Sequence, residues 1–272
     1  MSIEIKNQKF NVIEKLGKEN LERSVYKVES EKDHNIYIIK KIEILGLKEE
    51  EKNKIMNEAK ILENINHKNI VKLIDYDQDN EYFNILMEYC KGNDLEKFIE
   101  IHKEKNEKIK ESIICNIVLG ICLGLEEIHK KNIIHRDVKP ANIIIDDNYQ
   151  IKIVDFGVSK KIENNNILTK YVGTSYYMAP EIIKGEKYNH KVDIWAFGCI
   201  IYELLTLKVC FQDENLLALF NKIINGIHEN INSKEYNPKW KDLVDLLLKK
   251  NYNERPDIKE IKNIIQKLKM GL

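Results

Sequence analysis

The residues best suited to chemistry lie together in one segment, His135-Arg136-Asp137-Val138-Lys139-Pro140-Ala141-Asn142. A carboxylate such as that of Asp137 can orient an attacking hydroxyl group and accept its proton. Lys139, two residues further on, supplies a cation that would offset charge developing on a transferred group. The amide oxygen of Asn142 is a ligand suited to Mg²⁺. The segment therefore predicts a site for phosphoryl transfer.

A second carboxylate follows an apolar run. Asp155-Phe156-Gly157 comes 13 residues after Asn142, directly behind Ile151 to Val154. Asp155 would be the main Mg²⁺ ligand, and Gly157 would let the backbone turn sharply after it. The two motifs at this spacing have a chance rate well under about one in 10,000 for a chain of this length.

The elements that must position these residues change in type along the chain. Short segments rich in β-branched and aromatic residues predict strands over 10–13, 24–28, 36–39, 71–76 and 82–88, and a helical pattern covers 47–64. Beyond Gly92-Asn93-Asp94, apolar residues at helical spacing predict helices over 113–128, 192–205 and 257–269. We expect an α+β fold: a small antiparallel sheet lobe with one helix, and a larger helical lobe.

These motifs resemble the signature set of the eukaryotic-type serine/threonine protein kinases, and the resemblance covers nearly the whole chain. It implies a single bilobal kinase domain over 1–272, with an N-lobe at about 1–88, a hinge at about 88–92 and a C-lobe at about 93–272. Gly173 to Glu181 resembles the end of an activation segment, and Asp193 to Gly198 resembles a D-x-W-x-x-G core helix. Arg255 matches the arginine that pairs with Glu181 in kinases. Lys139 and Thr174 favour the serine/threonine class.

The resemblance also implies how ATP is held. Lys40 matches the strand lysine that grips the α- and β-phosphates, and Glu58 matches the helix glutamate that pairs with it. Met87 is similar to a gatekeeper, and the backbone of Glu88 to Cys90 would bond adenine. Asp94 falls where kinases often contact the ribose. The remaining residues expected to bind ATP are Leu16, Gly17, Val25 and Ile144.

Within this family the chain is most similar to the NIMA-related kinases. The similarity lies in 87–90, 215–219 and 222–226. It implies ATP and Mg²⁺ as cofactors and proteins with Ser or Thr hydroxyls as substrates.

The expected nucleotide site departs from the kinase pattern in its glycine-rich loop and at residue 38. In the glycine-rich loop only Gly17 remains, so the backbone that would cover the phosphates has lost its other glycines. Ile38 stands where kinases usually have the alanine that packs on adenine, and its extra bulk would cost roughly 1–3 kcal/mol if the pocket did not widen. These departures keep open a second hypothesis, a pseudokinase or scaffolding module with weak nucleotide binding. A small-molecule kinase of the same fold is a third.

Regulation by phosphorylation is a further expectation. Lys170 occupies the position where many relatives carry a phosphorylated residue, and the neighbouring Thr169 is a candidate phosphosite that Arg136 could pair with. The alternative is that Thr169 is an ordinary loop threonine.

Composition limits the other functional classes. The 272 residues carry 44 basic and 44 acidic side chains, so no global field favours nucleic acid or an anionic membrane. The N-terminus lacks a secretory signal, and the five cysteines form no C-x-x-C pair, which indicates a reducing compartment. We expect an intracellular protein, in the cytoplasm, in the nucleus or on the cytoskeleton. The sequence leaves its oligomeric state open.

Overall fold

A computed structural model describes residues 1–17, 23–161, 175–231 and 236–271. The chain divides into two compact units, Met1–Cys90 and Lys91–Leu272, which are described separately. The boundary falls within the segment 88–92, for which the hinge role stays a prediction.

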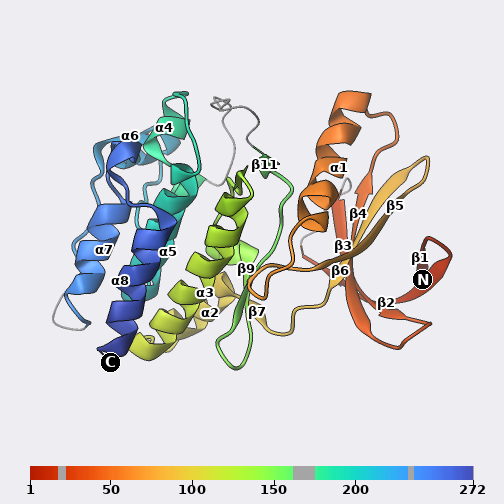
Figure 1. The fold of residues 1–272 in the computed structure, drawn as a ribbon, viewed down its shortest axis with the longest axis horizontal. Helices are drawn as coiled ribbons and strands as arrows, with labels where there is room; N and C mark the ends of the chain where they lie inside the picture. Colours follow the sequence, from red (N-terminus) through yellow and green to blue (C-terminus); the bar gives the residue numbers. More distant parts are fainter. Residues whose placement is uncertain (18–22, 162–174, 232–235, 272) are drawn as a thin grey trace. The chain divides into compact units, whose positions relative to one another are not determined.

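The first unit is an antiparallel sheet with one helix. Its six strands run in the order β1-β2-β3-β4-β6-β5, and helix α1 contacts β5 and β6 (Figure 1). The elements are β1 (Ser2–Ile5), β2 (Gln8–Leu16), β3 (Arg23–Ser30), β4 (Ile36–Glu43), α1 (Glu49–Glu63), β5 (Leu73–Gln78) and β6 (Tyr82–Glu88).

Strand β1 was not predicted, and it brings one edge of the curled sheet into contact with the other edge. A two-residue turn, Lys6-Asn7, joins it to β2, with φ values of +46° and +64°. At the other edge of the sheet, Asp77 accepts a hydrogen bond from the Lys6 backbone at 3.0 Å, and Asp75 pairs with the Lys6 ammonium. The two edge strands, β1 and β5, are therefore in contact.

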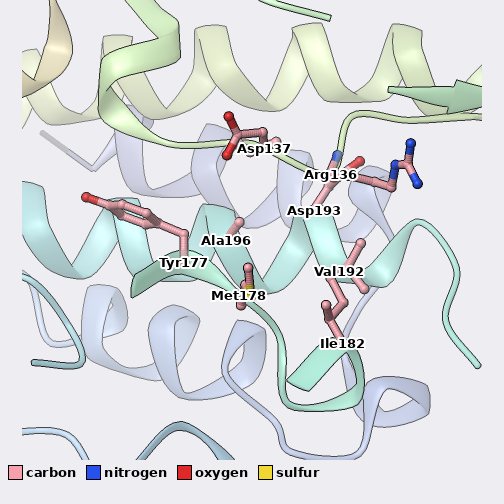
Figure 2. A pocket seen from close by; sticks show the side chains of 9 residues that line it. Arg136, Asp137, Tyr177, Met178, Ile182, Val192, Asp193 and Ala196 are labelled. Carbon is pink, nitrogen blue, oxygen red and sulfur yellow. The ribbon is translucent and has the colours of Figure 1, made fainter. Parts of the chain in front are cut away.

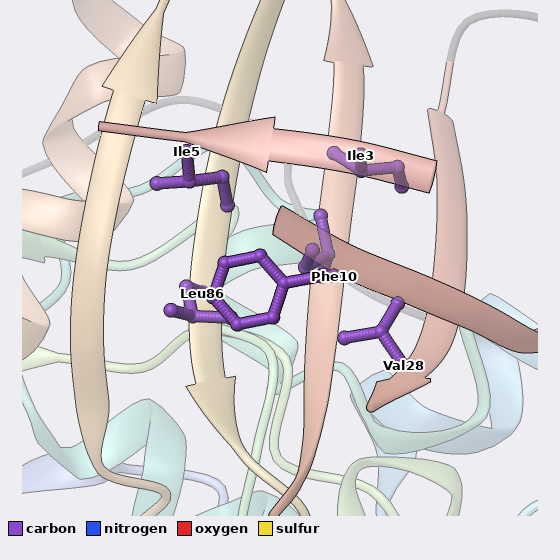
Figure 3. Packing of buried hydrophobic residues seen from close by; sticks show 6 residues of the cluster. Ile3, Ile5, Phe10, Val28 and Leu86 are labelled. Atoms are coloured by element: carbon purple, nitrogen blue, oxygen red, sulfur yellow. The ribbon is translucent and has the colours of Figure 1, made fainter. Parts of the chain in front are cut away.

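The concave side of the curled sheet holds an apolar core. Ile3 and Ile5 of β1 are 6% and 2% exposed and pack into it (Figure 3). The other members of this cluster are Phe10, Val28, Ile39 and Leu86. Because side chains alternate along a strand, Ile39 takes the core face of β4, whereas Ile38 and Lys40 share the opposite face.

The second unit is mainly helical. Its elements are β7 (Asn93–Asp94), α2 (Leu95–Glu104), α3 (Glu111–Lys130), β8 (Ile133–Ile134), β9 (Ile143–Ile145), β10 (Ile151–Ile153), β11 (Lys160–Lys161), α4 (Pro180–Ile183), α5 (Lys191–Thr206), α6 (Leu216–Asn225), α7 (Lys239–Leu247) and α8 (Ile258–Met270). Helix α5 lies at the centre of its core: residues 192–205 are all buried, and α3 and α7 pack against it (Figure 1).

Helix α3 is 20 residues long and apolar enough to cross a membrane by length and composition alone. However, 61% of its apolar window is buried inside the unit, as in the core helix of a globular domain. Cys115 and Cys122 are fully buried in this helix and pack in the core of the unit.

Several predicted boundaries are wrong by a few residues. The strand predicted at 71–76 is Leu73–Gln78, and the helix predicted from residue 47 begins at Glu49. The strands predicted at 10–13 and 36–39 extend to Leu16 and Glu43 respectively. These strand ends carry polar residues that gain their hydrogen bonds from neighbouring strands, which local sequence does not reveal.

Candidate active site

In the first unit, Lys40 and Glu58 form a buried ion pair. The Lys40 ammonium donates to both carboxylate oxygens of Glu58 at 2.9 Å, and the two residues are 8% and 2% exposed. Strand β4 supplies the lysine, and helix α1 supplies the glutamate from its inward face. A charge this deeply buried needs such a partner. The predicted pair is therefore present in the fold.

The strand face that carries Lys40 also carries the predicted adenine wall. Val25 lies opposite Lys40 on β3, and Met87 lies opposite Ile38 on β6. Leu16 lies opposite Val25 on β2. Ile38 is half-buried. Its side chain stands on the face against which the kinase resemblance places the base.

The segments that flank this wall are only partly described. Gly17 has φ of +81°, a conformation that favours glycine. The rest of the glycine-rich loop, residues 18–22, lies outside the described residues. At the end of β6, the Glu88 carboxylate accepts a hydrogen bond from the Lys72 backbone at 2.8 Å. Cys90, at the end of the unit, is half-buried.

In the second unit, Asp137 is held by the two neighbours that the sequence singled out. Its Oδ2 atom lies 2.8 Å from the Lys139 ammonium and accepts a hydrogen bond from Asn142 Nδ2 at 2.9 Å. Asn142 Nδ2 also donates to the Asp137 backbone carbonyl at 2.8 Å. The amide nitrogen of Asn142 is thus committed to Asp137, which leaves its oxygen as the atom suited to face a cation.

The backbone before Asp137 is strained and anchored. Arg136 has φ of +68°, a left-handed conformation that a non-glycine residue adopts only when its surroundings impose it. The buried Asp193 carboxylate of α5 accepts hydrogen bonds from the backbone N–H groups of His135 at 3.0 Å and Arg136 at 2.9 Å. His129 of α3 binds the same carboxylate at 2.9 Å.

The surroundings of Asp193 favour its ionised form despite its burial. Burial disfavours the charged carboxylate, but the hydrogen bond and charge of His129, together with donors of the loop 135–142 that carries Asp137 (the candidate catalytic loop), outweigh that cost and lower the pKa of Asp193. The anion therefore fixes the position of the loop that carries Asp137.

Asp155 adjoins this loop through the backbone. The Val154 N–H donates to the Asn142 carbonyl at 2.9 Å, which brings the residue before Asp155 alongside a predicted metal ligand. Asp155 is exposed and has φ of +61°. The following Phe156 is buried and meets the His135 ring edge-on at 4.8 Å. The His135 ring thus packs against Phe156, and burial lowers the pKa of His135.

Two predicted nucleotide contacts lie together in a small sheet. Strands β7 and β9 place Asp94 opposite Ile144. Asp94 also has a structural role, since its carboxylate caps helix α2 by accepting a hydrogen bond from Lys97 N at 2.7 Å. Gly92 precedes it with φ of +123°, where an added Cβ would lie 2.0 Å from the Ile145 carbonyl oxygen. Only glycine fits at that position.

A pocket in the second unit is lined by Asp137 and by the segment before α4. Figure 2 shows Asp137 and Tyr177 on one side of it, with the Arg136 side chain pointing away from the Asp137 carboxylate. The Tyr177 hydroxyl donates to Glu203 at 2.8 Å, and burial, with the nearby Glu203 charge, raises the pKa of Tyr177. Met178 also lines the pocket.

The end of the predicted activation segment is fixed by a second buried ion pair. The Arg255 guanidinium donates to both Glu181 oxygens at 2.6 and 2.8 Å, and both side chains are essentially inaccessible. The predicted pair is confirmed. The candidate phosphosite Thr169, together with Lys170, Gly173 and Thr174, lies outside the described residues.

Sequence reasoning identified Asp193 only as part of a motif and missed the role of His129. Both anchor the catalytic loop from helices distant in sequence. The available signal was chemical: an acid inside an otherwise apolar helix must find donors when it is buried.

Comparison with known proteins identifies the family. The model of the protein kinase domain family matches residues 10–264. The chain is 34% identical over 255 residues to serine/threonine-protein kinase Nek1 of Mus musculus, covering 93% of this chain and 21% of that protein. It is 35% identical over 242 residues to the probable serine/threonine-protein kinase nek2 of Dictyostelium discoideum, covering 87% and 58%.

A third relative, serine/threonine-protein kinase Nek9 of Mus musculus, is 36% identical over 226 residues, with 82% of this chain and 23% of that protein covered. The chain thus spans between about a fifth and three fifths of the length of these three relatives. Their names confirm the resemblance to NIMA-related kinases. The chain belongs to the protein kinase domain family.

Proposed function

We propose that this protein is a serine/threonine kinase that transfers the γ-phosphate of ATP to hydroxyl groups of other proteins. The observation that carries the proposal is the arrangement around Asp137, whose carboxylate is fixed by Lys139 at 2.8 Å and Asn142 at 2.9 Å. Membership of the kinase family and the Lys40–Glu58 pair support it.

Each residue has a role in this proposal that follows from its chemistry. Asp137 orients the acceptor hydroxyl and takes its proton. Lys139 lies beside that carboxylate, where its charge offsets the negative charge of the transferred group. Lys40, oriented by Glu58, binds phosphate oxygens.

The metal site rests on the donor set. Asn142 and Asp155 offer an amide oxygen and a carboxylate, the hard oxygen ligands that Mg²⁺ prefers. When bound, Mg²⁺ would be held by Asn142 and Asp155 and would neutralise part of the negative charge of the ATP phosphates. The backbone bond from Val154 to Asn142 keeps the two ligand segments adjacent.

The rival hypothesis is a pseudokinase, motivated by Ile38 and the loop after Gly17. The three relatives are named as serine/threonine-protein kinases, so their names do not support this hypothesis. A thermal-shift titration distinguishes the two hypotheses in part, because a ligand of the native state raises the melting temperature. We expect a shift at millimolar MgATP, which Asp155→Asn reduces. The absence of a shift would favour the scaffold.

Transfer itself is tested with γ-labelled ATP and a generic protein substrate, followed by identification of the modified residues by mass spectrometry. We expect phosphoserine and phosphothreonine. Label confined to tyrosine would contradict the assigned class, and label confined to a small molecule would favour the third hypothesis.

A further inference from the structure

A second histidine lies next to the Asp193 anchor and plays no part in the proposed transfer mechanism. His190 occupies the N-cap position of α5, and its ring lies 5.1 Å from the His129 ring, with 51° between the ring planes. The His190 side chain is about a third exposed, whereas that of His129 is 6% exposed. The two imidazoles are therefore neighbours, with one of them open to solvent protons.

His129 connects this neighbour to the catalytic loop. Its Nε2 atom binds Asp193 at 2.9 Å, and Asp193 holds the backbone N–H groups of His135 and Arg136. The other ring nitrogen of His129, Nδ1, is buried and has no hydrogen-bond partner within the part of the chain that the structure describes. With no second partner to stabilise it, the His129 ring is sensitive to a charge placed beside it.

The charges around His190 come from three helices and oppose each other. His129 of α3 and Lys191 of α5 disfavour a proton on His190, whereas Asp193 of α5 and Asp257, the N-cap of α8, favour it. Asp257 lies 3.9 Å from His190 but is already paired with the Lys191 ammonium. Burial, His129 and Lys191 prevail, so the pKa of His190 lies below its ordinary value.

We infer that His190 is a positioning residue for phosphoryl transfer, and that its protonation loosens the catalytic loop through His129 and Asp193. This inference rests on the proposed function. At neutral pH His190 carries no charge, and His129 donates to Asp193 undisturbed. When His190 gains a proton, its positive charge repels the His129 N–H group that binds Asp193. The same charge attracts the Asp193 carboxylate and so competes with His129 for it.

The direction of the pH effect follows from the geometry. A histidine whose neutral form is favoured in the folded protein loses that stabilisation as the pH falls below about 6.5, the ordinary value for histidine. Because the charge that His190 then gains disturbs the anchor of the catalytic loop, activity should fall on acidification. His190→Asn keeps a neutral polar group at the N-cap and removes the titration.

The test compares the wild-type protein, His190→Asn and His34→Asn, a control in which a largely exposed histidine of the first unit is replaced. Any titration of the nucleotide, the buffer or His135 affects all three proteins alike, so a difference between their pH profiles reports on the replaced histidine. Between pH 7.5 and 5.5, we expect kcat of the wild type and of His34→Asn to fall about tenfold further than kcat of His190→Asn. Equal pH profiles for all three proteins would overturn the inference.

A second measurement does not depend on catalysis. Amide hydrogen exchange of His135 and Arg136, expressed as protection factors, reports directly on the anchor that Asp193 provides. We expect their protection to fall on acidification in the wild type and to stay constant in His190→Asn. If no phosphate transfer is detected, the proposed function fails and the exchange result alone decides this inference. Protection that falls equally in both proteins would refute it.

Discussion

Replacement of Ile38 by alanine should improve ATP binding, although it removes apolar contacts from the protein. Ile38 lies on β4, two residues before Lys40, and opposite Lys27 on β3 and Met87 on β6. All four side chains share one face of the sheet, the face opposite the apolar core. The kinase resemblance places the base against this face, where other kinases usually have an alanine, so the larger isoleucine would occupy space that the base needs.

The magnitude follows from the three carbon atoms that the substitution removes. Overpacking by a group of this size costs roughly 1–3 kcal/mol, and 1.4 kcal/mol corresponds to about tenfold in a dissociation constant. We therefore expect the KM for ATP to fall about tenfold. Because Ile38 is only half-buried, the loss of folding stability should be smaller than the roughly 2–5 kcal/mol of a fully buried site.

The assay measures KM for ATP at saturating protein substrate, together with a thermal melt. Ile36→Ala is the matched control, because Ile36 is also half-buried on β4 and on the same face but lies opposite Glu29 at the far end of the strand. We expect the control to lower the melting temperature without changing KM. An unchanged or raised KM in Ile38→Ala would refute the idea that this side chain obstructs the base.

Three further substitutions, the last of them with a matched control, test other parts of the structure. Glu58→Gln should lower kcat/KM at least tenfold, because it leaves Lys40 buried without its counter-charge; steady-state kinetics measures this. Glu181→Gln should destabilise the protein by about 3–5 kcal/mol, since it strands the buried guanidinium of its partner; urea unfolding measures this. Ile5→Ala should lower the free energy of unfolding by about 2–4 kcal/mol, because it opens a cavity under β1. The control Glu4→Ala, on the exposed face of the same strand, should lower it by less than about 0.5 kcal/mol, and thermal melts compare the two variants.

Each of these has an outcome that would contradict it. Full kcat/KM in Glu58→Gln would mean that the ion pair does not orient the lysine. A stability change below about 1 kcal/mol in Glu181→Gln would mean that the pair is solvated in the folded protein. Equal melting temperatures for the two β1 variants would mean that this strand does not seal the core.

The sequence predicted those parts of the site that depend on fixed spacing. Asp137, Lys139 and Asn142 lie within six residues of one another, so their contact follows from one short loop. The pairs Lys40–Glu58 and Glu181–Arg255 are distant in sequence, and only the family resemblance predicted them. The structure shows both pairs.

What the sequence missed depends on long-range packing. Strand β1 has only four residues, and its alternation of Ile3 and Ile5 with polar neighbours is too short to stand out. Its stability comes from pairing with β2 and from the contact of Lys6 with β5, almost 70 residues away in the sequence. Asp193 could be placed on a helix but not under the catalytic loop, because that contact joins residues 57 positions apart.

The most direct test of the proposed mechanism is a single-turnover measurement of phosphate transfer by wild-type protein and by Asp137→Asn, with enzyme in excess over labelled ATP. Asparagine keeps the size of the side chain but cannot accept the hydroxyl proton. If Asp137 is the base, both proteins will bind MgATP with similar affinity, and the transfer rate of the variant will fall by about 10²-fold or more. Transfer by Asp137→Asn at the wild-type rate would contradict the assignment of the catalytic residue.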